Sequence, residues 1–238
     1  MTKLKVPQIL VGLGLAMILP ACVGFVFGVY SAEPIEAGVV DAETKQPIAG
    51  VIVTANWQLE EGTMGGNVPV GQLMVLETVT DKDGVFRFPG WGSKSAPKGH
   101  LVVHDPQLLL FKSGYEYRRL LNTFTADYNK GMRRRSEWSG RTIELKPFKG
   151  TAEEYAEHVY RLSSDVDSML DFARGDKDCN WKKTPLMLAA LHKMSLHFDA
   201  KRTKLRGWRL GQHILRIEDI PRNPVCGSPE VFFRSYLP

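Results

Sequence analysis

The sequence predicts a mainly β protein: a β-sandwich over residues 33–148, with an N-terminal membrane or signal helix before it (residues 1–32) and an α-helical extension with an irregular tail after it (residues 149–238). Three patterns predict this order: a charge-free apolar run, then short runs of alternating hydrophobicity, then apolar positions spaced by three and four. Hydrophobic residues make up 43% and charged residues 24%, which excludes a wholly disordered chain.

The N-terminal segment carries no charged residue between Lys5 and Glu33. An apolar stretch of this length is sufficient to cross the ~30 Å hydrocarbon core of a bilayer. Lys3 and Lys5 precede the stretch, so the positive-inside rule leaves the N-terminus in the cytoplasm and the folded part outside. We therefore expect a cell-envelope protein that is attached to the membrane through its N-terminal segment, with its folded part periplasmic or extracytoplasmic. Nucleic acid is not an expected partner, although the net charge is +5.

Three fates of this segment remain open at the sequence level. It is long enough for an uncleaved transmembrane anchor. Residues 19–22 (Leu-Pro-Ala-Cys) resemble a bacterial lipobox, which makes Cys22 a lipidation candidate. Cleavage by a signal peptidase after Ala32 is the third fate, although Tyr30 is then unfavourably placed at the −3 position.

The sandwich is predicted from short strands that are separated by turn residues. Residues 51–57 alternate between an apolar face and a mixed face, which predicts a strand buried mainly on one side. Residues 81–84 (Asp-Lys-Asp-Gly) lie between two β-type runs, 73–80 and 85–88, and predict a β-hairpin. Further strands are expected at 108–111, 115–121 and 142–145.

The spaced motifs of this region carry a family resemblance. They are Gly38 to Asp41, Thr44, Pro47 to Val51, Val53, Thr78 to Asp81, Asp83, Gly84, Phe86 and Phe111 to Tyr115, with Arg141 to Lys146 as a closing strand. Residues 33–148 resemble the carboxypeptidase regulatory-like domains, which have a transthyretin-like (prealbumin-like) sandwich. The resemblance implies a scaffold, adhesion or interaction role without catalytic residues in this module. Residues 58–71 exceed what a minimal domain of this kind needs, and we expect a long loop or disordered insertion there.

The C-terminal extension is predicted to contain two helices. Thr151 and Glu154 form a capping box in front of an apolar stripe that runs to residue 173. Thr184 and Pro185 fit the N-cap and the first position of a second helix. Cys179 and Cys226 are expected to pair in an oxidising compartment, which stabilises the fold by roughly 4 kcal/mol.

The sequence predicts no enzyme: we expect no catalytic residue, no metal site and no cofactor. None of the six histidines begins the His-x-x-Glu pair by which related carboxypeptidases hold zinc. The expected function is a non-enzymatic, envelope-tethered scaffold or protein-interaction module. The alternative is a binding module for saccharide or anionic envelope polymer, in which Arg133, Arg134 and Arg135 bind anions beside the exposed aromatics Trp91 and Trp138.

Overall fold

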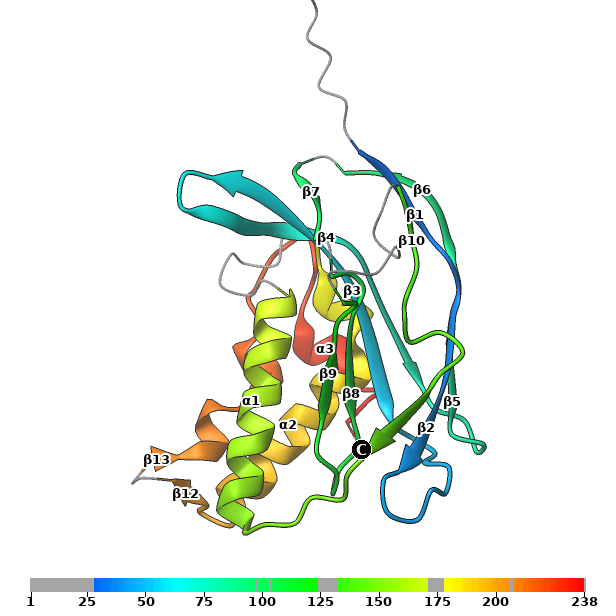
Figure 1. The fold of residues 1–238 in the computed structure, drawn as a ribbon. Coiled ribbons are helices and arrows are strands. Elements are labelled where there is room, and N and C mark those ends of the chain that lie inside the picture. Colours follow the sequence, from blue (N-terminus) through cyan, green and yellow to red (C-terminus); the bar gives the residue numbers. More distant parts are fainter. Residues whose placement is uncertain are drawn as a thin grey trace, which may run out of the picture.

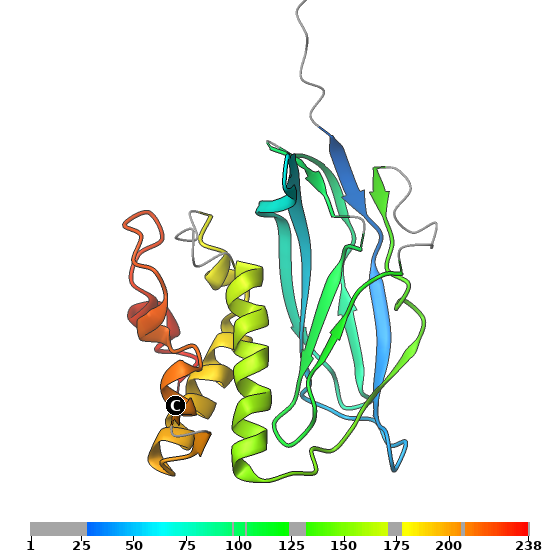
Figure 2. The same cartoon turned by 60° about the vertical axis from the view of Figure 1, so that its left-hand side comes forward.

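Two β-sheets pack face to face, and a layer of helices covers the outer face of one of them (Figures 1 and 2). The computed structural model describes residues 28–96, 98–102, 104–123, 132–170, 178–205 and 208–237. Residues 1–27, which include Cys22 and most of the apolar N-terminal segment, lie outside these ranges.

The first layer of the sandwich, which we call the first sheet, consists of two three-stranded sheets. It contains β1 (Val29–Ala32), β2 (Ile35–Asp41), β5 (Val85–Phe88), β6 (Trp91–Ser95), β10 (Arg133–Arg134) and β11 (Thr142–Leu145). The two three-stranded sheets are joined where β1 continues into β2 through Glu33 and Pro34. The upper half has the order β10-β1-β6 and the lower half the order β11-β2-β5. Gly90 joins β5 to β6 at the same junction, where a Cβ atom would come within 2.9 Å of the carbonyl oxygen of Ala32. A glycine at position 90 therefore allows the connection between β5 and β6 to pass close to the connection between β1 and β2.

The second sheet has the order β4-β3-β8-β9, with the short β7 also paired to β3. Its strands are β3 (Ile52–Thr63), β4 (Gly66–Val79), β7 (His100–Leu101), β8 (Gln107–Phe111) and β9 (Arg118–Leu120). The inner faces of the two sheets share one apolar core, to which β3 contributes Val53, Ala55 and Trp57 and the first sheet contributes Val39, Phe86 and Ile143, among others. The prediction of a β-sandwich is confirmed.

The first strand corrects the expected boundary of the N-terminal segment. β1 belongs to the sandwich, and Tyr30 and Ala32 are each only 7% exposed. The sandwich thus begins at residue 29 and not at residue 33. Cleavage after Ala32 would remove a strand that pairs on both of its edges, so this fate of the N-terminal segment does not fit the fold.

The region expected to be a long loop is a paired β-arm. β3 and β4 stay paired, with register shifts at Trp57/Gln58 and Leu59/Glu60, as far as the pair Thr63 and Gly66, so they form a hairpin that projects from the sandwich (cyan in Figure 1). Met64 at its tip is fully exposed. The loop prediction for residues 58–71 was wrong because backbone pairing, not apolar side chains, holds this arm together.

The turn at residues 81–84 is confirmed, but the hairpin is not. The Asp81 carboxylate accepts hydrogen bonds from the amides of Asp83 and Val85, and Gly84 has a positive φ of 72°. However, β4 pairs with β3 and β5 pairs with β2. The turn is a corner at which the chain crosses from one sheet to the other.

The helical layer consists of two main helices and several short elements. The main helices are α1 (Ala152–Leu170) and α2 (Pro185–Ala200); the short elements are η3 (Asn180–Lys183), β12 (Lys204–Leu205), β13 (Trp208–Arg209), η4 (Leu210–His213), η5 (Ile217–Asp219) and α3 (Pro229–Phe233). The capping box of α1 is confirmed: the amide of Thr151 donates to Glu154, and the amide of Glu154 donates to the Thr151 hydroxyl. Among the described residues, none of the helices has the length and apolar character needed to span a membrane.

The cap of α2 comes from the sandwich and not from the expected threonine. Thr184 occupies the N-cap position, but its side chain makes no capping hydrogen bond. The carboxylate of Glu77 on β4 accepts from the amides of Leu186 and Met187, at 2.7 and 2.9 Å. This contact fixes the start of α2 against the second sheet.

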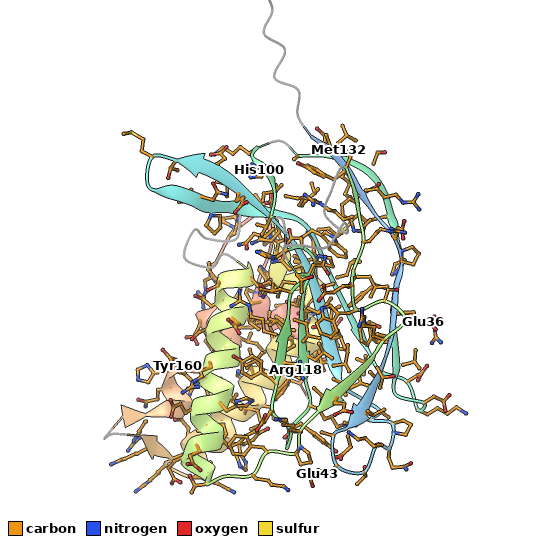
Figure 3. The ribbon with its side chains drawn as sticks, viewed as in Figure 1. Glu36, Glu43, His100, Arg118, Met132 and Tyr160 are labelled. Carbon is orange, nitrogen blue, oxygen red and sulfur yellow. A yellow bond between two sulfur atoms is a disulfide. The ribbon has the colours of Figure 1, made fainter. Side chains whose placement is uncertain are left out.

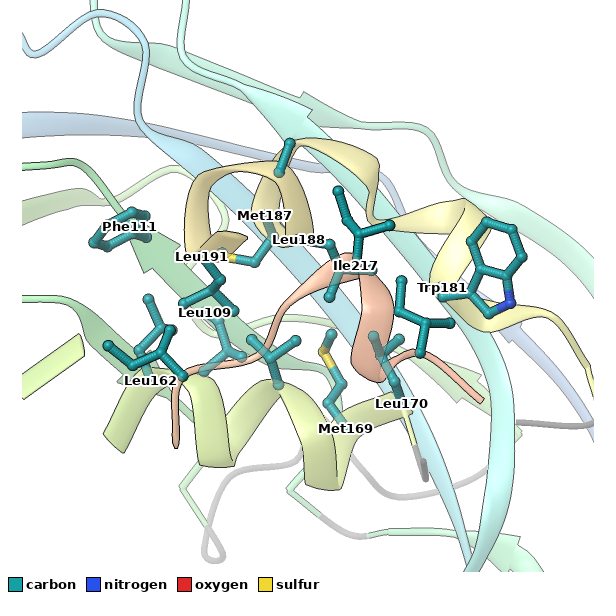
Figure 4. Packing of buried hydrophobic residues seen from close by; sticks show 14 of the residues in the cluster. Leu109, Phe111, Leu162, Met169, Leu170, Trp181, Met187, Leu188, Leu191 and Ile217 are labelled. Atoms are coloured by element: carbon teal, nitrogen blue, oxygen red, sulfur yellow. The ribbon is translucent and has the colours of Figure 1, made fainter. Parts of the chain in front are cut away.

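The helices and the outer face of the second sheet form a second apolar core (Figure 4). Leu109 and Phe111 of β8 meet Leu162, Met169 and Leu191 of the helices there, among others. Thr54 and Asn56 are consequently 0% and 1% exposed, so the first half of β3 is buried on both faces and the prediction of one buried face was wrong.

A disulfide between Cys179 and Cys226 closes the helical layer, as predicted. The bond ties the start of η3 to the tail in front of α3. Both cysteines belong to the second core.

Candidate functional site

The three consecutive arginines do not point to one side. Arg134 is 5% exposed, its guanidinium donates to the carbonyl oxygen of Leu101 at 3.2 Å, and it lies 5.5 Å from the centre of the Tyr30 ring. Burial lowers the pKa of Arg134, although the nearby Asp105 acts in the opposite direction. Because Arg134 is part of the core, the expected three-arginine anion site is wrong at this position.

Arg133 and Arg135 do reach the surface, where they share one carboxylate. Each has a guanidinium nitrogen 3.1 Å from an oxygen of Glu33. The charge of the pair is therefore partly neutralised within the protein. Exposed ion pairs of this kind contribute ~0–1 kcal/mol to stability.

The two expected aromatic platforms pack against the core of the sandwich. The ring of Trp91 meets Trp57 edge to face, with 5.5 Å between the ring centres. The indole nitrogen of Trp138 donates to the carbonyl oxygen of Leu121 at 3.2 Å. Both rings are half-buried, and these contacts give them structural roles.

Asp105 is a buried acid near the same end of the sandwich. Its carboxylate accepts from the amide of Gln58 at 2.7 Å, and it is 2% exposed. Burial raises the pKa of Asp105 well above its usual range, while the Gln58 hydrogen bond and Arg134 act against this rise. With so little access to solvent, Asp105 orders the interior and does not face a substrate.

Metal-ligating residues do not gather in the part of the chain that the structure describes. Within that part, no three side chains of His, Cys, Asp or Glu lie close enough to hold one ion together. His104 instead contacts the carbonyl oxygen of Asn122 through Nδ1, at 2.9 Å.

A polar cleft lies between the outer face of the second sheet and α1. Its volume is about 210 Å³, and its walls come from β3, β4, β8, β9 and α1: Asn56, Gln58, Pro69, Gln107, Arg119, Asp165, Ser168 and Met169. Asn56 and Gln107 are directly opposite in the register of β3 and β8, so their side chains leave the sheet on the same face. We call this region the amide cleft.

The charged wall of the amide cleft is an ion pair. The guanidinium of Arg119 lies 3.4 Å from one oxygen of Asp165, and the hydroxyl of Tyr117 donates to the other at 3.1 Å. Burial, and then the neighbouring Asp165, raise the pKa of Tyr117 to about 12. The tyrosine therefore remains a neutral donor at physiological pH and holds the Asp165 carboxylate in place.

A second, apolar groove runs along α2 on the same outer face of the second sheet, beside the first residue of β3 and the last residue of β4. It has a volume of about 600 Å³ and is lined by Ile52, Val79, Leu186, Ala189, Ala190, His192, Lys193, Leu196, Tyr236 and Leu237. Leu196 is 49% exposed and Tyr236 37%. This groove is large enough for several apolar side chains or an acyl chain.

Sequence reasoning missed the amide cleft although its signal was present. The mixed face of residues 52–58 carries Asn56 and Gln58 on a strand with strong alternation. Polar residues on one face of a strand ordinarily indicate contact with water. Only the position of α1 over this face makes them a cleft.

The comparisons with known proteins found no matching family model and no matching curated protein. Among solved structures, this chain is similar to 3-chlorocatechol 1,2-dioxygenase from Rhodococcus opacus 1CP, with 13% identity, a TM-score of 0.30 and coverage of 50% of this chain and 61% of that one. It is also similar to the group B streptococcus pilus 2b backbone protein, with 15% identity, a TM-score of 0.26 and coverage of 49% and 41%. A third similar structure is the C-terminal domain of the shaft pilin SpaA from Lactobacillus rhamnosus GG. It has 13% identity and a TM-score of 0.23, and the match covers 50% of this chain and 98% of that one.

This chain covers less than two thirds of the length of the first two of these structures. All three TM-scores are too low to support an argument about fold or function. The resemblance to carboxypeptidase regulatory-like domains thus stays a prediction, and the sandwich rests on the strand pairing described above.

Proposed function

We propose that this protein is a non-enzymatic interaction module of the bacterial cell envelope, held at the membrane by its N-terminal segment. The observation that carries the proposal is the position of β1. Its first residue, Val29, directly follows the apolar run, and β1 pairs with β6 on one edge and with β10 on the other. The sandwich is therefore joined to the apolar segment without a linker.

The shortened apolar run still has the length that an anchor needs. Residues 6–27 precede the described part of the chain and carry no charge. At ~1.5 Å rise per residue, a helix of about 20 residues crosses the ~30 Å core of a bilayer. Lipidation at Cys22 is the other tether that fits the fold, since a short spacer would then separate the lipid from β1.

The end of the sandwich where β1 begins suits a position close to lipid headgroups. Met132 and Val29 are 52% and 46% exposed there, and Met132 lies at the end of the fold where β1 begins (Figure 3). Its carbonyl oxygen accepts from the amide of Ser31 on β1 at 2.9 Å. Arg133 follows Met132 with its guanidinium on the surface. Apolar and basic side chains together are favourable at an anionic membrane surface. This arrangement would direct the opposite end of the molecule away from the membrane.

The side chains that the sequence singled out for saccharide or anion binding make structural contacts instead. Arg134 is buried, and Trp91 and Trp138 pack against the core of the sandwich. The alternative function, binding of an anionic polymer through these residues, loses its central cation for the same reason.

Membrane fractionation and intact mass spectrometry test the tether. The full chain is expected in the membrane fraction, with its folded part digested by protease added to spheroplasts. An unprocessed mass identifies a transmembrane anchor; loss of residues 1–21 with added acyl mass, abolished in Cys22→Ser, identifies a lipoprotein. Recovery of the protein in the cytosol, or of a chain that begins at Glu33, would contradict the proposal.

Crosslinking in intact cells tests the interaction role. A membrane-impermeant, amine-reactive crosslinker is expected to join the protein to a second envelope component at native expression level. A monomer alone under every crosslinking condition, together with turnover of a substrate by the purified chain, would contradict a non-enzymatic interaction module.

A further inference from the structure

We propose that the amide cleft between α1 and the second sheet binds one ring of a neutral, polyhydroxylated ligand, that is, a saccharide unit. This site goes beyond the proposed function, because it does not depend on how the chain is tethered. It is also distinct from the arginines and tryptophans that the sequence suggested for saccharide binding.

The first observation is an unsatisfied acceptor at the floor of the cleft. Asn56 is 1% exposed, and its Oδ1 has no hydrogen-bond partner within the described part of the chain. Buried polar atoms nearly always have a partner, since leaving one unpaired is unfavourable. The side chain lines a cavity, and a rotation of its carboxamide would turn Oδ1 towards a ligand in this cavity, which can then supply the missing donor.

The second observation is the composition of the walls. Gln107 is 9% exposed and lies opposite Asn56, and Gln58 follows on the same face of β3. Each carboxamide offers both a donor and an acceptor, and each sugar hydroxyl does the same. Amide-rich walls therefore complement neighbouring hydroxyl groups better than they complement a charged or purely apolar ligand.

The charge of the cleft favours a neutral occupant. Its cation, Arg119, is already paired with Asp165. A phosphate or carboxylate would have to compete with Asp165, whereas a hydroxyl group can bind to the free edges of both side chains. The pair can thus orient a ligand without a net charge.

The size and the apolar surface of the cleft fit one ring. A volume of about 210 Å³ corresponds to several water molecules at ~30 Å³ each, which is the range of a single monosaccharide. Met169 and Pro69 provide apolar walls for the C–H face of a sugar ring. Binding sites commonly combine such apolar walls with a few convergent polar groups.

Ligand-observed NMR on the full chain tests the site. The protein is kept in a detergent without a sugar headgroup, because alkyl glycosides would compete for the cleft. The probes are glucose, galactose and N-acetylglucosamine, each titrated into the millimolar range. We expect saturable saturation-transfer signals for at least one of the three.

Two variants and a matched control assign the signal to the cleft. Asn56→Leu and Gln107→Leu are each expected to weaken binding by about tenfold or more. Gln46→Leu changes the same residue type at an exposed position outside the lining, and should bind like the original chain. Circular dichroism of each variant shows whether it folds; Gln58→Ala replaces any variant that does not.

Three results would overturn the site. The first is the absence of saturable binding of all three sugars. The second is unchanged affinity in both Asn56→Leu and Gln107→Leu. The third is tighter binding of inorganic phosphate than of any sugar, which would indicate an anion site at Arg119.

Discussion

The two faces of β3 are covered by different parts of the chain and differ in chemistry. The inner face carries the apolar residues Val53, Ala55 and Trp57. It packs on the first sheet, whose strands come from the same sandwich region of the sequence. The outer face, with Ile52, Thr54 and Asn56, is covered by helices about 100 residues further along the chain. It is apolar at one end and rich in carboxamides at the other.

The two faces of β3 therefore have different roles: the inner face contributes to stability, and the outer face contains the proposed binding site. A uniformly apolar interface fills completely, because apolar side chains pack without directional requirements. A face that mixes Leu109 and Phe111 with Asn56 and Gln107 fills only in part, and the amide cleft remains at the polar end. The inner face thus holds the fold together, and the outer face leaves room for a ligand.

The largest effect is expected on the inner face. Trp57 is 1% exposed and meets Trp91 edge to face, so Trp57→Ala should lower the free energy of unfolding by about 3–5 kcal/mol. Urea denaturation followed by circular dichroism measures the change. Val68→Ala on the exposed β-arm is the control and should change the stability by less than about 0.5 kcal/mol. A loss below 1 kcal/mol in Trp57→Ala would show that the inner face does not dominate the stability.

Removal of the disulfide should loosen the layer that covers the outer face. The double variant Cys179→Ser, Cys226→Ser is expected to lose about 2–4 kcal/mol of stability. Hydrogen exchange should accelerate in α2 and the tail more than in the inner strands, because both cysteines lie in the second core. If hydrogen exchange accelerated equally in the helical layer and in the inner strands, the two layers would unfold as one unit.

The contact between Glu77 and α2 should make the attachment of the helices depend on pH. Burial raises the pKa of Glu77 from 4.5 to about 7, and its hydrogen bonds to Leu186 and Met187 oppose this shift. The folded state then binds the proton more tightly than the unfolded state. The contribution of Glu77 to stability is consequently full below pH 4.5 and declines as the pH rises to about 7, by at most about 3 kcal/mol.

Glu77→Gln isolates this effect, since glutamine resembles the protonated acid and does not titrate. The difference in unfolding free energy between Glu77→Gln and the original chain should be small near pH 4.5 and should favour the variant at pH 8. Urea denaturation at four pH values in this range is the measurement. A difference that favours the original chain increasingly as the pH rises would mean that the ionised cap is the stable form.

The smallest effect is expected at the polar end of the outer face. Asn56→Leu removes an unpaired buried acceptor and replaces it with an apolar side chain of similar shape. The stability should stay constant or rise, within about 1 kcal/mol, while saccharide binding weakens by about tenfold or more. A loss of more than 2 kcal/mol would show that Asn56 has a structural role instead.

Much of the fold could be predicted from local patterns. The alternation at residues 51–57, the turn at 81–84 and the capping box at Thr151 each depend on neighbours in the sequence, and all three are present. The pairing of Cys179 with Cys226 followed from the compartment and an even count. The candidate site could not be predicted in this way, because Arg134 was read as exposed and Asn56 as solvated.

The sequence by itself determined the inner face of the sandwich, the start of α1 and the charge-free run before β1, because these features follow from short-range periodicity and backbone preference. The tertiary structure alone decided which strands the turn at residues 81–84 connects, that Glu77 caps α2, and that a helical layer buries the second face of β3. Each of these depends on which distant segments meet, and a polar residue such as Asn56 reads the same in the sequence whether water or a helix lies above it.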